Sequence, residues 1–309
     1  MKHEKLRLYI GWITVALSTL FSGLWAFWGT IENFHEGWYS TSLWENIGLL
    51  LIQYWSIMIA FMTIGLIALR WRIAGLALYA GIAVFAMWFF HSANENVLIP
   101  FIVLPLILMG LGFFWGTPNP RKYAYYLQAG LPALVVLGCL IEPVYRVSTR
   151  VDDGNRGMRR VEVGTVKLYW APQGPGWPDG GIDWYEAQRR CAYLSEDGTR
   201  LEDHPVNIWR LPTIEEVVQS QHRRGKPAGG IWNPQTQKAT YAITPDKEPP
   251  LWNPYSKVIY WWTATEIPNN RALRVVYNQW VVGTPKMARW GYLGFRAVKP
   301  IPEPTTKKP

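Results

Sequence analysis

Cysteine and histidine are scarce in this chain of 309 residues, which has two cysteines and five histidines. Cys139 lies in an apolar stretch and Cys191 in the polar second half, so we expect no disulfide between them. Of the histidines, only His204 and His222 fall in the polar half, and they lie in different segments. We therefore expect no cofactor, no metal centre, and a C-terminal domain that depends on its hydrophobic core alone.

Charge is nearly absent from five apolar stretches of the first half: residues 8–29, 47–69, 73–90, 97–116 and 125–142. Each is close to the ~20 residues that an α-helix needs to cross ~30 Å of hydrocarbon. Transporters and channels place ionisable groups inside their spans, and the lack of such groups here favours a helical bundle that serves as an anchor. We expect an all-α transmembrane domain of five spans within residues 1–144.

Basic residues in the short connections fall on one side of this expected bundle. They are Lys2, Lys5, Arg7, Arg70, Arg72, Arg121 and Lys122. The other two connections, residues 32–46 and 91–96, contain no lysine or arginine. The positive-inside rule then places the N-terminus in the cytoplasm, and five spans place everything after Val144 outside it. No small-residue cleavage site follows the first stretch, so it is expected to be a retained signal anchor of the cytoplasmic membrane.

A nucleic-acid partner is excluded despite the formal net charge of +9. Basic residues of the polar half alternate with Asp and Glu and form no basic groove with interleaved aromatic residues. The doublets Arg159–Arg160, Arg189–Arg190 and Arg223–Arg224 are typical of solvated faces. Arg146 and Arg150 follow the last stretch directly and are placed to meet anionic lipid headgroups.

The polar half divides into an extended linker at residues 145–164, a domain at 165–300 and a disordered Pro/Lys tail at 301–309. Two helices are expected in the domain. Asp183 should cap the first, and Thr213 and Glu216 should form a capping box at the start of the second. Strands are expected at residues 166–170, 258–265, 272–282 and 291–298. Helices followed by a short antiparallel sheet indicate an α+β domain.

Four segments of this half carry a resemblance, and they are Trp184–Leu194, Trp209–Val217, the run Tyr260-Trp-Trp-Thr-Ala-Thr, and Gly291–Val298. In this order they resemble the motifs of the DUF1566 family, also called the Lcl C-terminal domain. The resemblance covers about residues 165–300 and implies a C-type-lectin-like fold, distantly related to formylglycine-generating enzymes. The positions that carry it are Trp184, Cys191, Trp209, Arg210, Leu211, Pro212, Thr213, Glu216, Tyr260, Trp261, Trp262 and Arg296.

These signature positions are expected to build the scaffold rather than to contact a ligand. Arg210 should pair with a carboxylate or with backbone carbonyls near the second helix. Pro212 should end the extended segment before that helix, and Trp209, Trp261 and Trp262 should lie in the core.

Two functions other than plain binding remain open. A formylglycine-generating enzyme needs a cysteine pair late in the domain, and no cysteine follows Cys191. A calcium-dependent glycan binder needs clustered carboxylate and amide oxygens; Glu266, Asn269 and Asn270 offer a possible ligand surface, but Ile267 breaks the spacing. Glu32, His35 and Glu36 have the residue types of metal ligands, although a solvated turn is favoured for them.

The preferred interpretation is a non-catalytic extracytoplasmic interaction module, an accessory subunit of a membrane complex. Its expected partners are the lipid bilayer and either other membrane or cell-surface proteins or glycans.

Overall fold

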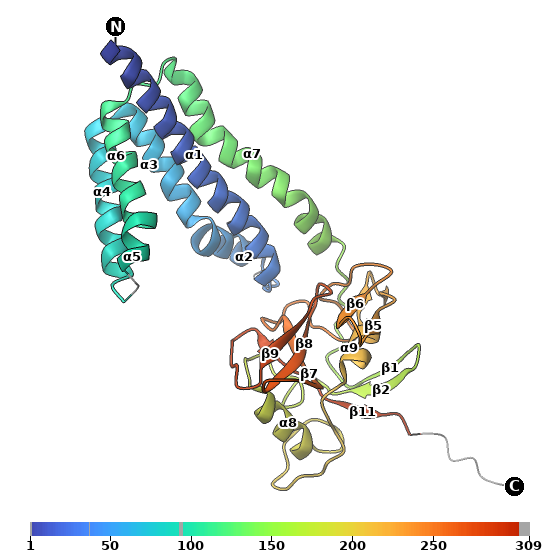
Figure 1. The fold of residues 1–309 in the computed structure, drawn as a ribbon. Coiled ribbons are helices and arrows are strands. Elements are labelled where there is room, and N and C mark those ends of the chain that lie inside the picture. Colours follow the sequence, from blue (N-terminus) through green and yellow to red (C-terminus); the bar gives the residue numbers. More distant parts are fainter. Residues whose placement is uncertain (1, 37, 93–94, 303–309) are drawn as a thin grey trace, which may run out of the picture. The chain divides into compact units, whose positions relative to one another are not determined.

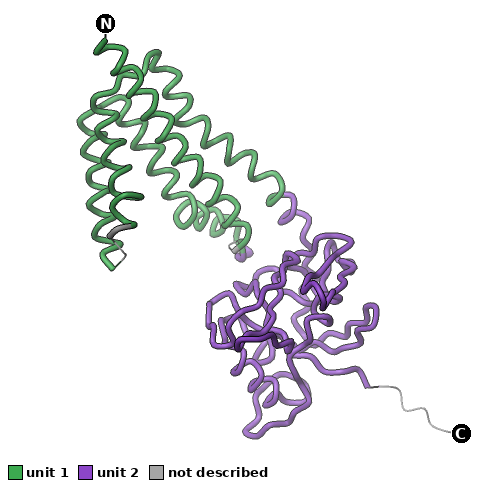
Figure 2. The backbone as a smooth tube through the Cα atoms, viewed as in Figure 1, with its two compact units in different colours: residues 1–38, 42–144 green, residues 39–41, 145–309 purple. Residues whose placement is uncertain are grey.

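The computed structural model describes residues 2–36, 38–92 and 95–302. The chain divides into two compact units, which are coloured separately in Figure 2. Unit 1 comprises residues 1–38 and 42–144, and unit 2 comprises residues 39–41 and 145–309. Residues 303–309, most of the expected disordered tail, lie outside the described part of the chain.

Unit 1 is built from helices (Figure 1). They are α1 (Lys2–Glu36), α2 (Leu43–Leu49) with the π-helix η1 (Leu50–Tyr54), α3 (Ser56–Arg70), α4 (Arg72–Phe89), α5 (Glu95–Leu98) with the π-helix η2 (Ile99–Val103), α6 (Leu104–Trp115) and α7 (Arg121–Ser148). Only the first 24 residues of α7 belong to unit 1, since its last turn is part of unit 2.

Three described helices are long and apolar enough to cross a membrane: Lys2–His35, Arg72–Phe89 and Arg121–Ser148. The stretch expected as one span at 47–69 is broken, because η1 ends at Tyr54 and α3 starts after a bend of 62°. This pair makes a fourth span only if it is counted as one broken helix. The stretch at 97–116 forms the shorter apolar helix Ile99–Trp115. The N-terminal region is thus helical and apolar, with three or four candidate spans where the sequence predicted five.

Small residues let these helices approach closely. A Cβ atom on Gly112 of α6 would lie 2.1 Å from the Thr14 hydroxyl oxygen of α1, and one on Gly75 of α4 would lie 2.3 Å from the Ala68 Cβ of α3. Close backbone approach of this kind is how helices gain dispersion energy where lipid is as apolar as the side chains.

Unit 2 combines short sheets with two helices, α8 (Trp184–Tyr193) and α9 (Ile214–Ser220). One antiparallel sheet has the order β1-β2-β11, and a larger one has the order β10-β7-β8-β9, in which only β10 runs parallel to its neighbour. Two hairpins, β3–β4 and β5–β6, complete the unit. The strands are β1 (Arg159–Val163), β2 (Val166–Trp170), β3 (His222–Arg223), β4 (Lys226–Pro227), β5 (Ile231–Asn233), β6 (Lys238–Thr240), β7 (Tyr260–Ile267), β8 (Arg271–Val276), β9 (Val281–Pro285), β10 (Leu293–Gly294) and β11 (Val298–Pro300).

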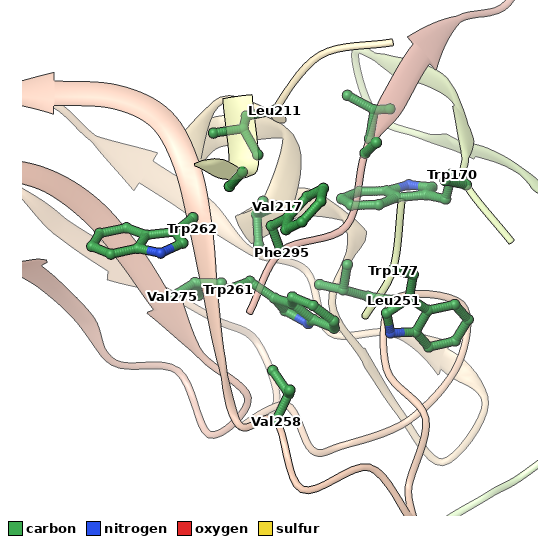
Figure 3. Close-up of a cluster of buried hydrophobic side chains, with 14 of the residues drawn as sticks. Trp170, Trp177, Leu211, Val217, Leu251, Val258, Trp261, Trp262, Val275 and Phe295 are labelled. Atoms are coloured by element: carbon green, nitrogen blue, oxygen red, sulfur yellow. The ribbon is translucent and has the colours of Figure 1, made fainter. Parts of the chain in front are cut away.

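Tryptophan fills the core between these sheets and helices (Figure 3). The rings of Trp252 and Trp261 lie 5.0 Å apart, and Trp177 lies 6.5 Å from Trp261. Phe295 and Leu251 pack into the same cluster, fully buried. Rings of this size bury large apolar areas in a domain that has few long helices, so they supply much of its stability.

Two expected strands are divided in the structure. The stretch expected at 272–282 forms β8 and β9, joined by a turn in which Gln279 adopts a φ of 95°. The stretch at 291–298 contributes β10 to one sheet and the start of β11 to the other. A continuous run of β-favouring residues did not reveal either turn, because neither contains the Asn-Gly or Asp-Gly signal of a tight hairpin.

The expected linker at residues 145–164 is largely ordered structure. α7 continues to Ser148, and β1 at Arg159–Val163 pairs along its length with β2. The segment between them carries Asx turns, in which Asp152 and Asp153 accept from the backbone N–H groups of Gly154 and Asn155. The alternation of side-chain types and the polarity of residues 145–164 predicted an extended segment. They did not predict a strand, because the pairing of β1 with β2 cannot be derived from the segment alone.

Candidate functional site

The motif at the start of α9 forms a closed set of contacts. The Thr213 hydroxyl accepts from the Glu216 N–H at 3.2 Å, and the Glu216 carboxylate accepts from the Thr213 N–H at 2.8 Å, which confirms the predicted capping box. Arg210 donates to both carboxylate oxygens of Glu216, at 2.7 and 2.6 Å, and to the Leu211 carbonyl at 3.0 Å. The Pro212 carbonyl accepts from Ala264 of β7 at 2.7 Å. These groups therefore join α9 to the large sheet.

The signature residues Trp184, Trp209 and Trp262 donate their indole N–H groups to backbone carbonyls. Trp209 donates to Ser195, Trp184 to Thr263 and Trp262 to Ile182, each at 2.8 Å. All three rings are buried, as is Trp261, and Tyr260 is half-buried at the start of β7. The expected core position of Trp209, Trp261 and Trp262 is confirmed.

Arg296 is a fully buried arginine that contacts backbone rather than a carboxylate. It donates to the carbonyls of Ala171 at 2.8 Å and Leu251 at 3.1 Å, and also to Pro250, while its guanidinium lies 3.7 Å from the Trp177 ring centroid. Burial lowers the pKa of Arg296. A planar group with several donors can satisfy carbonyls from separate loops at once, so this residue ties three segments of the core together.

Burial changes the pKa of the thiol of Cys191 and of the imidazole of His222. Cys191 is 1% exposed on the inner face of α8, as predicted, and burial raises the pKa of its thiol. Burial also lowers the pKa of His222, whose Nδ1 atom lies 3.0 Å from the Ser220 carbonyl oxygen. A protonated, buried thiol is a poor nucleophile. Asp183 caps α8 as expected, because its carboxylate accepts from the Glu186 N–H at 2.8 Å.

The expected ligand surface consists of Glu266, near the end of β7, and of Asn269 and Asn270 in the turn before β8. Both asparagines have positive φ angles, 65° and 54°, a conformation that asparagine tolerates well. The Asn270 side-chain oxygen accepts from the Tyr185 hydroxyl at 2.7 Å, and Glu266 pairs with Lys286. Among the described residues, no group of three or more His, Cys, Asp or Glu side chains is placed to hold a metal ion.

A buried charge cluster around Asp246 escaped the sequence analysis. Its carboxylate accepts from Arg150 at 2.9 Å and from Arg146 at 3.4 Å, and it also pairs with Arg223 and with the Lys247 N–H at 2.7 Å. Asp246 is completely buried. The arginines expected to meet lipid headgroups, Arg146 and Arg150, and the expected surface residue Arg223 are thus joined to one carboxylate inside unit 2.

The electrostatics of this cluster favour the charged aspartate. Burial alone would raise the pKa of Asp246, but Arg150, Arg146, the Lys247 N–H and Arg223 together hold it below its ordinary value. The run Pro245-Asp-Lys-Glu-Pro-Pro is typical of a solvated turn, so local sequence gave no sign of this burial. The sequence offered only the opposite charges of Asp246 and of the arginines as a sign that they pair, and these residues are far apart along the chain.

A second polar cluster joins the helices of unit 1. The Gln128 amide of α7 donates to the Ser18 hydroxyl of α1 at 3.0 Å and accepts from Thr19 at 3.2 Å. The Ser18 hydroxyl also bonds to the Tyr79 hydroxyl of α4 at 2.9 Å. Gln128 is fully buried, so its amide is satisfied by neighbouring helices rather than by solvent. The cluster serves helix association.

Open grooves with mixed polar linings lie among the described residues of unit 2. One of about 770 Å³ lies along the loop after α8 and includes Asp197, Arg200, His204 and Lys299. Another, of about 320 Å³, lies beside β1 and includes His222. Asp197 accepts from Ser195 and Thr199, which holds its pKa at about 2. Ser195 also lines the larger groove, and its hydroxyl donates to Asp197 at 2.6 Å.

Comparison of the chain with protein-family models, with curated proteins and with solved structures finds no match.

Proposed function

We propose that this protein is a membrane-anchored, non-catalytic binding module whose C-terminal unit faces away from the cytoplasm, and that it acts as an accessory subunit of a membrane complex. The observation that carries the proposal is the use of the signature residues. Arg210, Thr213 and Glu216 bind one another, Trp209 and Arg296 bind backbone, and Cys191 is buried. Side chains that are buried or bonded to one another in this way stabilise the fold and do not react with a substrate.

The proposed topology has five spans, with the N-terminus in the cytoplasm. It rests on the one-sided basic residues and on treating both the bent α2–α3 pair and the helix Ile99–Trp115 as crossings. The helix Ile99–Trp115 is near the lower limit of ~17 residues for a helix that crosses a membrane at 1.5 Å per residue. An odd number of crossings then places unit 2 in the extracytoplasmic space.

The proposed fold of unit 2 is C-type-lectin-like, in keeping with the resemblance to the DUF1566 family. Two helices, a small antiparallel sheet and long loops around a tryptophan core support this assignment. Fold alone does not determine activity, so the binding role rests on the side chains and not on the family.

The test is isolation of the tagged full-length chain from its native membrane in a mild detergent. We expect it to co-purify with a membrane or cell-surface partner in a fixed ratio. Cys191→Ala should retain that partner, because the thiol is buried in the core. Elution of the chain alone, together with rapid labelling of native Cys191 by a thiol reagent, would contradict the proposal and favour a redox or catalytic role.

A further inference from the structure

The sheet β1-β2-β11 of unit 2 has one covered edge and one open edge. At the covered edge, the N–H and C=O groups of Val298 in β11 bond to the backbone of Arg210, at 2.8 and 3.0 Å. The opposite edge is β1, whose strand partner among the described residues is β2 alone. Because an edge strand with unpaired backbone groups is a template for another strand, β1 is where this sheet can be extended.

The register of β2 shows which backbone groups of β1 point outward. The Ile301 N–H donates to the Lys167 carbonyl at 3.3 Å, so the odd-numbered residues of β2 bond to β11. Its even-numbered residues therefore bond to β1, where their partners in the register are also odd-numbered. The N–H and C=O groups of Arg160 and Glu162 consequently face away from the sheet, and they have no hydrogen-bond partner within the described part of the chain.

Space is available beside this strand. All five residues of β1 line an open groove of about 320 Å³, whose other wall includes Pro227, Pro249 and Pro250. Figure 1 shows the β1–β2 hairpin projecting from the rest of unit 2, with β1 on the side away from β11. The outward backbone groups of β1 are therefore accessible to another chain.

The two exposed side chains of β1 lie on one face of the strand and have opposite charges. Arg160 and Glu162 contact each other at 2.5 Å, and Arg160 also interacts with Tyr169 of β2. Their side chains remain 60% and 45% exposed, respectively. An ion pair this exposed contributes little within one chain, and both groups remain open to a second partner of opposite charge.

A second copy of β1 is complementary to the first in one antiparallel register. With Val161 of each copy opposite Val161 of the other, every Arg160 lies opposite a Glu162 on the same face, and cross-strand pairs of opposite charge are stabilising. The same register pairs the outward backbone groups, so that each Arg160–Glu162 pair exchanges both of its main-chain hydrogen bonds. Shifting one copy by two residues places like charges opposite each other, and shifting it by one residue pairs outward with inward backbone groups.

We propose that two copies of this protein pair through β1, so that their sheets continue into one another across a two-fold axis at Val161. Such an interface uses the same patch on both subunits, as the commonest symmetric dimers do. Two copies in one membrane present β1 on the same side, and their confinement raises the effective concentration at which these short strands meet. The inference goes beyond the proposed binding role, because the partner is a second copy of the chain rather than another protein.

The first test is disulfide formation between two differently tagged full-length chains in their native membrane. A Cys139→Ala background leaves the buried Cys191 as the native thiol. One chain carries Arg160→Cys and the other Glu162→Cys, which the register places about 5.5 Å apart between Cα atoms, within the range of a disulfide. We expect this combination to cross-link. Two chains that both carry Arg160→Cys are the control and should cross-link several-fold less, because diagonal positions lie about 7–8 Å apart.

The second test exchanges the charges, using full-length chains with donor or acceptor fluorescent proteins fused at Pro309, in phosphatidylcholine vesicles without other proteins. Arg160→Glu and Glu162→Arg, each tested alone, place like charges opposite each other and should weaken self-association about tenfold. Mixing these two variants restores opposite charges in both pairs and should restore energy transfer. The matched control is Arg200→Glu, since Arg200 is paired with Glu202 at the same spacing and is 75% exposed; it should leave self-association unchanged.

Restored energy transfer in the mixture also shows that both variants are folded. Self-association that is absent from the vesicles, that ignores the charge exchange, or that the mixture does not restore would overturn the proposal. A cross-link from position 160 or 162 to a different protein would also overturn it and would assign β1 to the partner of the proposed function. Co-purification of an accessory partner is a separate measurement, so either proposal can fail without the other.

Discussion

At the scale of single residues, unit 2 is held together by buried aromatic rings, some of which also donate hydrogen bonds to backbone carbonyls. Trp209 shows both features, since its ring is 3% exposed and its N–H donates to the Ser195 carbonyl. Removing the ring leaves a cavity and removes one hydrogen bond to the Ser195 carbonyl, which still accepts from the Gly198 N–H. Trp209→Ala should therefore lower the free energy of unfolding by about 3–5 kcal/mol, measured on the detergent-solubilised full chain by near-ultraviolet circular dichroism.

Thr213→Ala provides the comparison for that measurement. It removes a helix cap without opening a cavity and should cost only about 0.5–2 kcal/mol. If both variants melt at the same temperature, the large contribution assigned to the buried indole is wrong.

Residues whose partners are close in sequence could be predicted, and residues with distant partners could not. The bonds between Thr213 and Glu216 follow from helix geometry, and so does the inward position of Cys191. The side chain of Arg296 has hydrogen-bond partners 45 or more residues away in the sequence. The arginines that bind Asp246 are 23 or more residues away from it, and only the Lys247 N–H is a local partner of its carboxylate. Neither pairing can be derived without knowing how the loops fold back.

At the scale of elements, Gly65 of α3 leaves room for the buried side chain of Gln128 of α7. A Cβ on Gly65 would lie 2.3 Å from the side-chain nitrogen of Gln128, whereas a Cβ on Gly81 would meet nothing within 4 Å. Gly65→Ala should displace the Gln128 amide and destabilise unit 1 by about 1–3 kcal/mol. Gly81→Ala should be neutral or slightly stabilising.

These two alanine variants are compared by thermal unfolding of unit 1 in detergent. Equal behaviour would mean that the close contact at Gly65 does not hold in the membrane protein.

Within unit 2, Asp246 binds Arg146 and Arg150 at and after the end of α7. Asp246→Asn removes the carboxylate that three arginines share and should cost about 3–5 kcal/mol, as breaking a buried ion pair does. Asp153→Asn removes a half-exposed partner of Arg159 and should cost at most about 1 kcal/mol. Thermal unfolding of the full chain compares the two variants, and a loss at position 246 no larger than at 153 would contradict the buried cluster.

Acid should weaken the same cluster. The pKa of Asp246 is lowered in the folded protein, so its stabilising effect is complete above the unfolded value of about 3.9 and is lost as the pH falls through the folded value. The difference in stability between wild type and Asp246→Asn should accordingly shrink below about pH 4 and stay constant near neutral pH. A difference that instead narrowed as the pH rose would have the wrong sign for this account.

Elements with a strong period were predictable, and interruptions within them were not. Both helices of unit 2 and the strand Val166–Trp170 follow from capping residues and alternation. The break between η1 and α3 has no proline or charge to mark it, and hydropathy alone merges the two helices into one span. Similarly, β8 and β9 were merged because the turn at Tyr277–Trp280 is rich in residues that favour strands.

At the scale of the whole molecule, the number of crossings decides where unit 2 functions. Five spans place it outside the cytoplasm, and four place it on the same side as the N-terminus. The bent α2–α3 pair and the short helix Ile99–Trp115 are the elements on which this number depends. The basic residues at Arg70, Arg72, Arg121 and Lys122 favour five, because each doublet then lies in the cytoplasm.

The most direct test of this account is a pair of reporter fusions to the full chain. A reporter that is active only in the cytoplasm is placed at Pro309, and the control fusion is placed in the connection before α7, at Asn119. We predict a silent reporter at Pro309 and an active one at Asn119, with the reverse pattern for a reporter that works only after export. Cytoplasmic activity at Pro309 would contradict the five-span topology and the extracytoplasmic binding role together.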